Sequence, residues 1–217
     1  MTQPTEPHRD VEILDNTPVY QGFFSMHKLR LKHKRFAGDW TPALSRELVY
    51  RGHAVGVLAY DPWQDQVVMV EQFRIGALQN TQSPWLIELI AGLVEPGEPV
   101  EEVARREAQE EAGLQLLSLE KLFTYYSSPG GTDEQVTLFC GLVDARTAGG
   151  IHGLESENED IRVLVKSRTE AFQEASQGRA ANAMSLIGLQ WLEREYPRLM
   201  RLAQNNPLLK KPREASK

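Results

Sequence analysis

The chain has 217 residues, enough for one domain of ordinary size and an extension. Its 24 Lys and Arg against 30 Asp and Glu give a formal net charge of -6. This balance argues against a general nucleic-acid partner or a membrane-surface role, since both favour a basic face. An acidic chain can still bind a phosphate-containing substrate, because a bound metal ion reverses the local potential.

The sequence also argues against a membrane-spanning segment and against an intrachain disulfide. No apolar run approaches the roughly 18 residues of a membrane span, and the first ten residues are polar, without the apolar core of a signal peptide. The single cysteine, Cys140, excludes an intrachain disulfide and is expected to be a small buried side chain. We therefore expect a cytoplasmic protein.

Residues 1–45 are expected to form a β extension. Strand-like runs cover residues 11–14, 19–24 and 29–32. Strands left alone present unpaired edges and are barely stable, whereas exchange with a symmetric partner satisfies those edges. We predict a homodimer with these strands swapped between its chains.

Residues 46–200 are expected to form the catalytic domain, followed by a tail at 201–217. Many strands with few helices indicate an α+β domain of layered architecture. Strands are predicted at 46–60, 66–73, 86–90, 115–126, 135–143 and 161–165, and helices at 99–112, 169–177 and 182–195.

The predicted helix 99–112 carries acids on its apolar face. Its apolar stripe is formed by Val100, Val103, Ala104 and Ala108. At about 100° per residue, Glu107 and Glu111 fall within this stripe and Glu110 falls on its flank. Neighbouring like charges repel, burial raises the cost, and the helix dipole disfavours acids in the C-terminal half. A chance pattern on a solvated helix is one interpretation. Carboxylates converging on Mg²⁺ explain the placement better.

The surrounding spacing is that of a known motif. Five residues separate Gly92 from Glu98, and seven separate Glu98 from the run Arg106-Glu107-Ala108-Gln109-Glu110-Glu111-Ala112-Gly113-Leu114. This segment resembles the Nudix box, with Ala108 where the family usually has a larger aliphatic residue. The resemblance implies the Nudix fold, a mixed sheet between helices (α/β/α). It also implies two or three Mg²⁺ ions, with Mn²⁺ as an alternative, held by Glu107, Glu111, Glu159 and the Ala91 carbonyl. Glu110 is expected to take part in catalysis.

Two further segments resemble bacterial ADP-ribose pyrophosphatases. Pro129 follows Gly113 by sixteen residues, a spacing that marks ADP-ribose specificity in the family; a plain hairpin turn is the alternative. Residues 155–160 contain four acids, which a solvated loop would also explain. By resemblance, Glu157 is the general base and Glu159 a metal ligand, and the two roles remain exchangeable.

The resemblance also implies a substrate site shared between two chains. In similar enzymes an aromatic residue of the N-terminal strands stacks on adenine, although Phe23 and Phe24 fit an ordinary core equally well. The expected substrate contacts are Phe23, Phe24, Arg46, Glu47, Arg51, Arg74, Leu93, Ser128, Pro129, Gly130 and Glu134. Arg51 and Arg74 are expected to reach phosphates.

The resulting prediction is Mg²⁺-dependent hydrolysis of ADP-ribose to AMP and ribose 5-phosphate. One alternative is the same chemistry on another nucleoside diphosphate sugar such as GDP-mannose. A second is a non-catalytic sensor of ADP-ribose, against which the intact acids of the helix argue.

Overall fold

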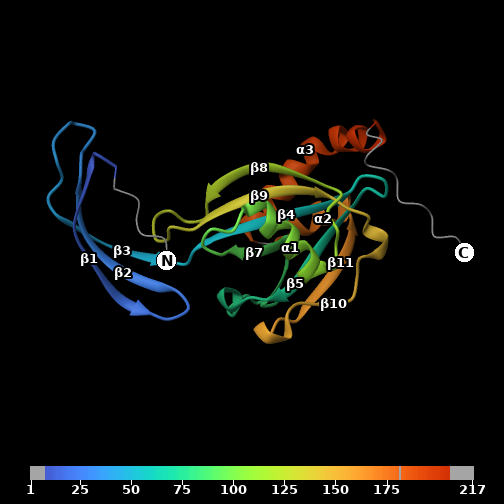
Figure 1. The fold of residues 1–217 in the computed structure, drawn as a ribbon, viewed down its shortest axis with the longest axis horizontal. Helices are drawn as coiled ribbons and strands as arrows, with labels where there is room; N and C mark the ends of the chain where they lie inside the picture. Colours follow the sequence, from blue (N-terminus) through green and yellow to red (C-terminus); the bar gives the residue numbers. More distant parts are fainter. Residues whose placement is uncertain (1–7, 181, 206–217) are drawn as a thin grey trace, which may run out of the picture.

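The computed structural model describes residues 8–180 and 182–205, apart from the side chain of Glu157. Two sheets are present. One is small and N-terminal, and it stands to the side of a larger body that contains every helix of this part of the chain (Figure 1).

The N-terminal sheet has three antiparallel strands in the order β1-β2-β3, namely β1 (Val11–Gln21), β2 (Ser25–His33) and β3 (Leu44–Tyr50). The expected run 19–24 therefore divides. Strand β1 ends at Gln21, and Phe23 and Phe24 lie in the bend before β2. The predicted boundary between residues 45 and 46 falls inside β3.

The large sheet has eight strands, and its main path runs β10-β11-β5-β4-β9-β8. Strands β4 and β9 are parallel while the other pairs are antiparallel, so the sheet is mixed, as predicted. The strands are β4 (His53–Asp61), β5 (Gln66–Phe73), β6 (Trp85–Glu88), β7 (Ile90–Val94), β8 (Ser118–Tyr126), β9 (Gln135–Leu142), β10 (Ile151–His152) and β11 (Ile161–Ser167).

The large sheet forks between β4 and β5, and this fork positions residues of the candidate site. Strands β4 and β5 pair only over Ala59–Asp61 and Gln66–Val68 and then separate. Strand β6 pairs with β5, and β7 pairs with β4, so these two short strands fill the gap. The far end of β5 and the start of β7 are thereby brought beside the same helix, α1 (Val100–Ala112).

Helices cover both faces of the large sheet. On β4, Val57 belongs to a core shared with α1, whereas its neighbour Leu58 belongs to a second core. The second core includes residues of α2 (Arg168–Ser176) and α3 (Ala183–Asn205). Because successive strand residues face opposite sides, the predicted α/β/α layering is confirmed.

The bounds of two helices can be compared with those predicted from the sequence. Helix α1 begins after Pro99 and is capped by Gly113 at φ 64, the left-handed conformation that glycine adopts readily. Helix α3 continues ten residues beyond its predicted end at 195 and passes through Pro197. Burial of Leu199 and Ala203 in this added part offsets the backbone hydrogen bond that proline removes.

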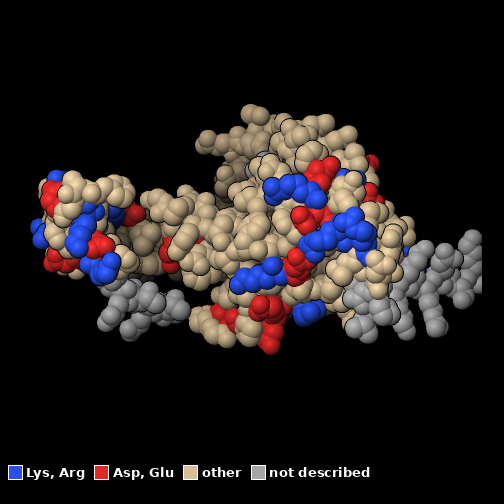
Figure 2. Space-filling view, turned by 90° about the horizontal axis from the view of Figure 1, so that it is seen from above, with Lys and Arg blue, Asp and Glu red and all other residues tan. Residues whose placement is uncertain are grey.

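The surface carries both acidic and basic side chains, as the composition indicates. Figure 2 shows acidic and basic side chains beside one another over both the N-terminal sheet and the large body. In the part of the chain that is described, no helix has the length and apolarity needed to cross a membrane.

Candidate active site

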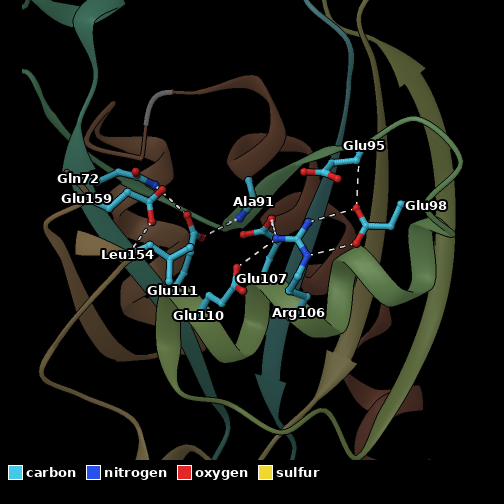
Figure 3. Close-up of polar contacts among 10 residues, drawn as sticks. All are labelled: Gln72, Ala91, Glu95, Glu98, Arg106, Glu107, Glu110, Glu111, Leu154 and Glu159. Atoms are coloured by element: carbon cyan, nitrogen blue, oxygen red, sulfur yellow. Dashed lines mark hydrogen bonds and ion pairs between the residues drawn. The ribbon is translucent and has the colours of Figure 1, made fainter. Parts of the chain in front are cut away.

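Helix α1 buries two carboxylates against the fork of the sheet. Glu107 is 8% exposed and Glu111 is 3% exposed. The backbone N–H of Ala91 donates to Glu111 Oε2 at 2.9 Å, and Gln72 Nε2 lies 3.5 Å from Oε1 (Figure 3). A Cβ at Gly92 would overlap the Glu107 carboxylate, so only glycine leaves this acid its place. The predicted helix face is therefore the observed one.

Arg106 holds the acids around it. Its Nη1 donates to Glu107 Oε1 at 2.7 Å and to Glu110 Oε2 at 3.1 Å (Figure 3). Its Nε donates to Glu98 Oε1 at 3.2 Å. Arg106 thus pairs with Glu98 and with Glu110 at the same time. Glu107 is a third partner, although adjacent helix residues do not usually face each other.

Burial shifts the protonation of both buried acids. Desolvation raises the pKa of Glu111 to about 8, with the Glu107 charge adding and the Ala91 hydrogen bond opposing. Desolvation also raises the pKa of Glu107, against the lowering effect of Arg106. Carboxylates whose charge is costly in this position are carboxylates that a cation would stabilise.

The acidic loop lies at the C-terminal end of α1. The N–H of Gly153 donates to the Glu110 carbonyl at 3.4 Å. Glu159 Oε2 accepts from the N–H of Leu154 at 3.1 Å, and its charge acts on both Glu107 and Glu111. Glu157 ends the short helix η3 (Glu155–Glu157), and its side chain lies outside what the structure describes.

These residues have the chemistry that a divalent cation requires. Among the described residues, no three His, Cys, Asp or Glu side chains surround a common point as a complete metal cage. Protein donors satisfy the acids instead, namely Arg106 for Glu107, Ala91 for Glu111 and Leu154 for Glu159. Two buried carboxyl groups beside the Ala91–Gly92 backbone offer the oxygen donors that Mg²⁺ prefers.

A second group of predicted residues gathers where the N-terminal sheet joins the body. The guanidinium of Arg51 lies over the Phe24 ring, 5.1 Å from its centroid, and Arg51 Nε lies 3.2 Å from Glu134 Oε1. Glu134 is buried, whereas Phe23 is 85% exposed. Phe23 is therefore not a core residue of this chain.

The Pro129 turn is attached to β3. Gly131 and Thr132 both donate their N–H groups to the Ser128 carbonyl at 3.1 Å, which closes a turn containing Pro129 and Gly130. The N–H of Val49 then donates to the Gly131 carbonyl at 2.9 Å. The exposed turn residues thus lie close to the join between the two sheets.

The remaining predicted contacts are distributed along the strands. Leu93 lies on β7 opposite Ala54 of β4, beside the Ala91–Gly92 backbone. Arg46 and Glu47 are exposed on β3. Arg74 follows β5 and donates from Nε to Glu88 Oε2 at 2.7 Å.

Sequence reasoning missed several supporting residues. Gln72 carries no signal of its own, because it is one of two adjacent polar residues, with Glu71, near the end of a largely apolar strand. Glu88 did carry one, since it is a lone acid in the apolar run from Trp85 to Ile90. Its partners Arg74 and Asn182 are distant in the sequence and could not be paired without the structure.

The chain is similar along most of its length to proteins of known name. The ADP-ribose pyrophosphatase of Haemophilus influenzae is 48% identical over 194 residues, covering 88% of this chain and 89% of that protein. The Escherichia coli K12 protein of the same name is also 48% identical, over 88% of this chain and 91% of its own. A GDP-mannose pyrophosphatase of Cronobacter sakazakii is 32% identical, over 85% of this chain and 95% of its own.

A solved structure described as an ADP compounds hydrolase superposes with a TM-score of 0.65 at 18% identity, covering 88% of this chain and 98% of that one. It shares the fold. The NUDIX domain family matches residues 50–183, which include the whole of α1 and the acidic loop. With its acids, glycines and arginine at the spacing of the family motif, the chain belongs to the NUDIX family.

Proposed function

We propose that this protein is a hydrolase that cleaves the diphosphate bond of ADP-ribose, giving AMP and ribose 5-phosphate. The observation that carries the proposal is the buried pair Glu107 and Glu111 on α1. The 48% identity to proteins named ADP-ribose pyrophosphatase supports the choice of substrate.

The charge of the substrate sets the task of the site. A diphosphate is anionic, so it repels a hydroxide nucleophile and needs its charge neutralised before attack. Bound Mg²⁺ ions, two or three with Mn²⁺ as a substitute, would supply this neutralisation and acidify a water. Glu107, Glu111, Glu159 and the Ala91 carbonyl are the proposed ligands. Arg106 would keep Glu107 oriented and Glu110 within the same network.

The proposed general base is Glu157. It would take the proton of the attacking water as the oxygen approaches phosphorus in line with the leaving oxygen. The start of its loop lies beside α1, where the N–H of Gly153 donates to the Glu110 carbonyl. The assignment rests on the family resemblance, and exchanging it with Glu159 is the alternative.

The remaining predicted residues would bind the two ends of the substrate. Arg51 and Arg74 would contact phosphates. Leu93 and the turn of Ser128, Pro129 and Gly130 would line the site around Glu134. The adenosine end would meet Arg46, Glu47 and an aromatic side chain, Phe23 or Phe24.

We further propose a homodimer in which residues 1–45 are exchanged between chains. The apolar residues of the N-terminal sheet that remain exposed, among them Ile13 and Val19, support a partner at this surface. The exchange would bring Phe23 or Phe24 to the adenine site of the other chain. Residues 46–200 would form the catalytic domain, with 201–217 as its tail, and residues 206–217 lie outside the described chain.

A second candidate is hydrolysis of GDP-mannose, which the relatives named GDP-mannose pyrophosphatase favour at 32% identity. The deciding experiment is product analysis of purified protein with Mg²⁺ and a panel of dinucleotides and nucleotide sugars. AMP and ribose 5-phosphate from ADP-ribose, at the highest kcat/KM of the panel, is the expected result. A higher kcat/KM for GDP-mannose would select the second candidate.

Binding of ADP-ribose without turnover, with Mg²⁺ present, would instead point to a sensor.

We also propose that the protein acts in the cytoplasm. A lone buried cysteine, Cys140, suits a reducing compartment.

A further inference from the structure

Glu88 is a buried acid without a part in the chemistry described above. It is 3% exposed and ends β6, inside the fork of the large sheet. An ionised carboxylate in such a place is costly unless it is paired and hydrogen-bonded. A carboxylate at this position of an apolar strand therefore requires partners that stabilise it or a function that explains it.

Two side chains from different elements of the chain hold this carboxylate. Arg74 Nε donates to Oε2 at 2.7 Å, and Asn182 Nδ2 donates to Oε1. Asn182 is itself fixed, since its Oδ1 accepts from the N–H of Ser185 at 2.7 Å in the first turn of α3. Ser185 Oγ accepts from the N–H of Leu89 at 3.0 Å. The Glu88 carboxylate is thus tied to both the sheet and α3.

The pairing leaves Arg74 oriented for a ligand. Its side chain is 42% exposed, and within the described residues its Nη atoms have no hydrogen-bond partner. A guanidinium fixed through Nε presents its two Nη groups, which match the oxygens of a phosphate. Gln72, two residues earlier, contacts Glu111, so this end of β5 borders the candidate metal site.

We propose that Glu88 is a positioning residue for the substrate. It fixes the Arg74 guanidinium so that both Nη groups face the diphosphate, and Asn182 fixes Glu88. The inference rests on the proposed function, because it needs a diphosphate substrate. It also predicts a sign: by charge alone, an acid near the site weakens anion binding, whereas a positioning acid strengthens it.

The test measures ADP-ribose binding by calorimetry in EDTA, where no hydrolysis occurs, together with kcat and KM in Mg²⁺. Glu88→Gln removes one of the two acceptors that Arg74 and Asn182 require. We expect Kd and KM to rise roughly tenfold, as for partial loss of one charge-assisted hydrogen bond, with kcat within a few-fold. Glu88→Asp keeps the charge and the fold but withdraws the carboxylate, and it should weaken binding as well.

A double-mutant cycle separates positioning from a purely structural effect. In an Arg74→Ala background, Glu88→Gln should weaken binding no further. Glu174→Gln is the matched control, since Glu174 is a buried acid on α2 that pairs with Lys166 at 3.0 Å and Arg179 at 2.8 Å. This control should lower the melting temperature comparably while leaving Kd unchanged.

Tighter or unchanged binding in both Glu88 variants would overturn the proposal, and so would a full additional loss in the Arg74→Ala background. If the wild type prefers another nucleotide sugar, the same cycle on that substrate tests Glu88 independently of the ADP-ribose assignment. A wild type that binds no diphosphate compound would overturn both.

Discussion

The N-terminal sheet and the catalytic body have comparable backbone pairing but very different packing. The body contains two cores, one on each face of its sheet, closed by α1 and by α2 with α3. In the three N-terminal strands, the described residues include one buried apolar side chain, Leu29 at 7% exposure. Paired strands alone are not enough for independent stability, because most of the stabilisation comes from apolar burial.

The register explains what the N-terminal sheet lacks. Leu31 on the central strand β2 lies opposite Ile13 of β1 and Leu44 of β3, so this row of one face is apolar across all three strands. No helix covers this face in the described chain (Figure 1). The body therefore holds the proposed reacting groups between its own cores, while the sheet leaves exposed the apolar side chains that the proposed partner chain would cover. The predictions below test that division of labour.

The largest effect should come from the body. Glu111→Gln should remove nearly all ADP-ribose hydrolysis while leaving the circular dichroism spectrum and the sedimentation of the protein unchanged. The amide loses the anionic ligand that a cation needs, but its oxygen can still accept from the Ala91 N–H. Glu101→Gln, at an exposed position of the same helix, should retain activity. Hydrolysis by Glu111→Gln within a few-fold of wild type would refute the metal assignment.

The acidic loop should give the next effect. Glu157→Gln should lower kcat by about 10² to 10⁴, the usual contribution of a general base, and change substrate affinity little. Glu159→Gln should mainly raise the Mg²⁺ concentration needed for half-maximal rate. If the kcat loss appears in Glu159→Gln instead, the two roles are exchanged.

A smaller effect should come from the N-terminal sheet. Phe23→Ala/Phe24→Ala should raise KM roughly tenfold with little change in kcat, since base stacking adds on the order of 1–3 kcal/mol of affinity. Sedimentation of the wild type should give about twice the 24.5 kDa chain mass.

Mixing these two kinds of defective chain tests exchange of the sheet directly. A Phe23→Ala/Phe24→Ala chain mixed with a Glu111→Gln chain should regain activity once subunits exchange, because some sites then combine an intact sheet with an intact body. A monomer with full activity would contradict the dimer proposal and leave the sheet without a role in catalysis.

The last prediction concerns the stability of the metal-free protein and not its catalysis. Burial raises the pKa of Glu111 from 4.5 to about 8. Between these values the folded chain keeps a proton that the unfolded chain releases, so the free energy of unfolding should fall as pH rises from about 4.5 to about 8. The expected loss is on the order of a few kcal/mol.

Denaturant unfolding in EDTA at several pH values measures this loss. Glu111→Gln, which cannot ionise, should flatten most of the dependence, and the raised pKa of Glu107 should account for a remainder of the same sign. An equal slope in wild type and Glu111→Gln would show that the dependence arises elsewhere.

Much of the body could be predicted from the sequence because its signals are local. Periodicity placed Glu107 and Glu111 on the apolar face of α1, and the predicted helix 99–112 differs from α1 by one residue at its start. These features depend on residues within one or two helical turns of one another. The α+β class followed from the pattern of elements, whereas the mixed sheet and the α/β/α layers followed from the family resemblance.

Only the tertiary structure decided the features that join distant segments. Glu88 meets Arg74 across two strands and Asn182 across 94 positions, so neither pair leaves a local pattern. The exposure of Phe23 depends on which elements pack near the N-terminal sheet, and the sequence pattern around this residue does not specify those elements. Helix α3 passed Pro197 because the second core lies beneath Leu199. Local spacing in the sequence identified the functional side chains that the protein carries. Long-range packing determined which of these side chains are buried and fixed, because burial depends on every element that contributes to a core.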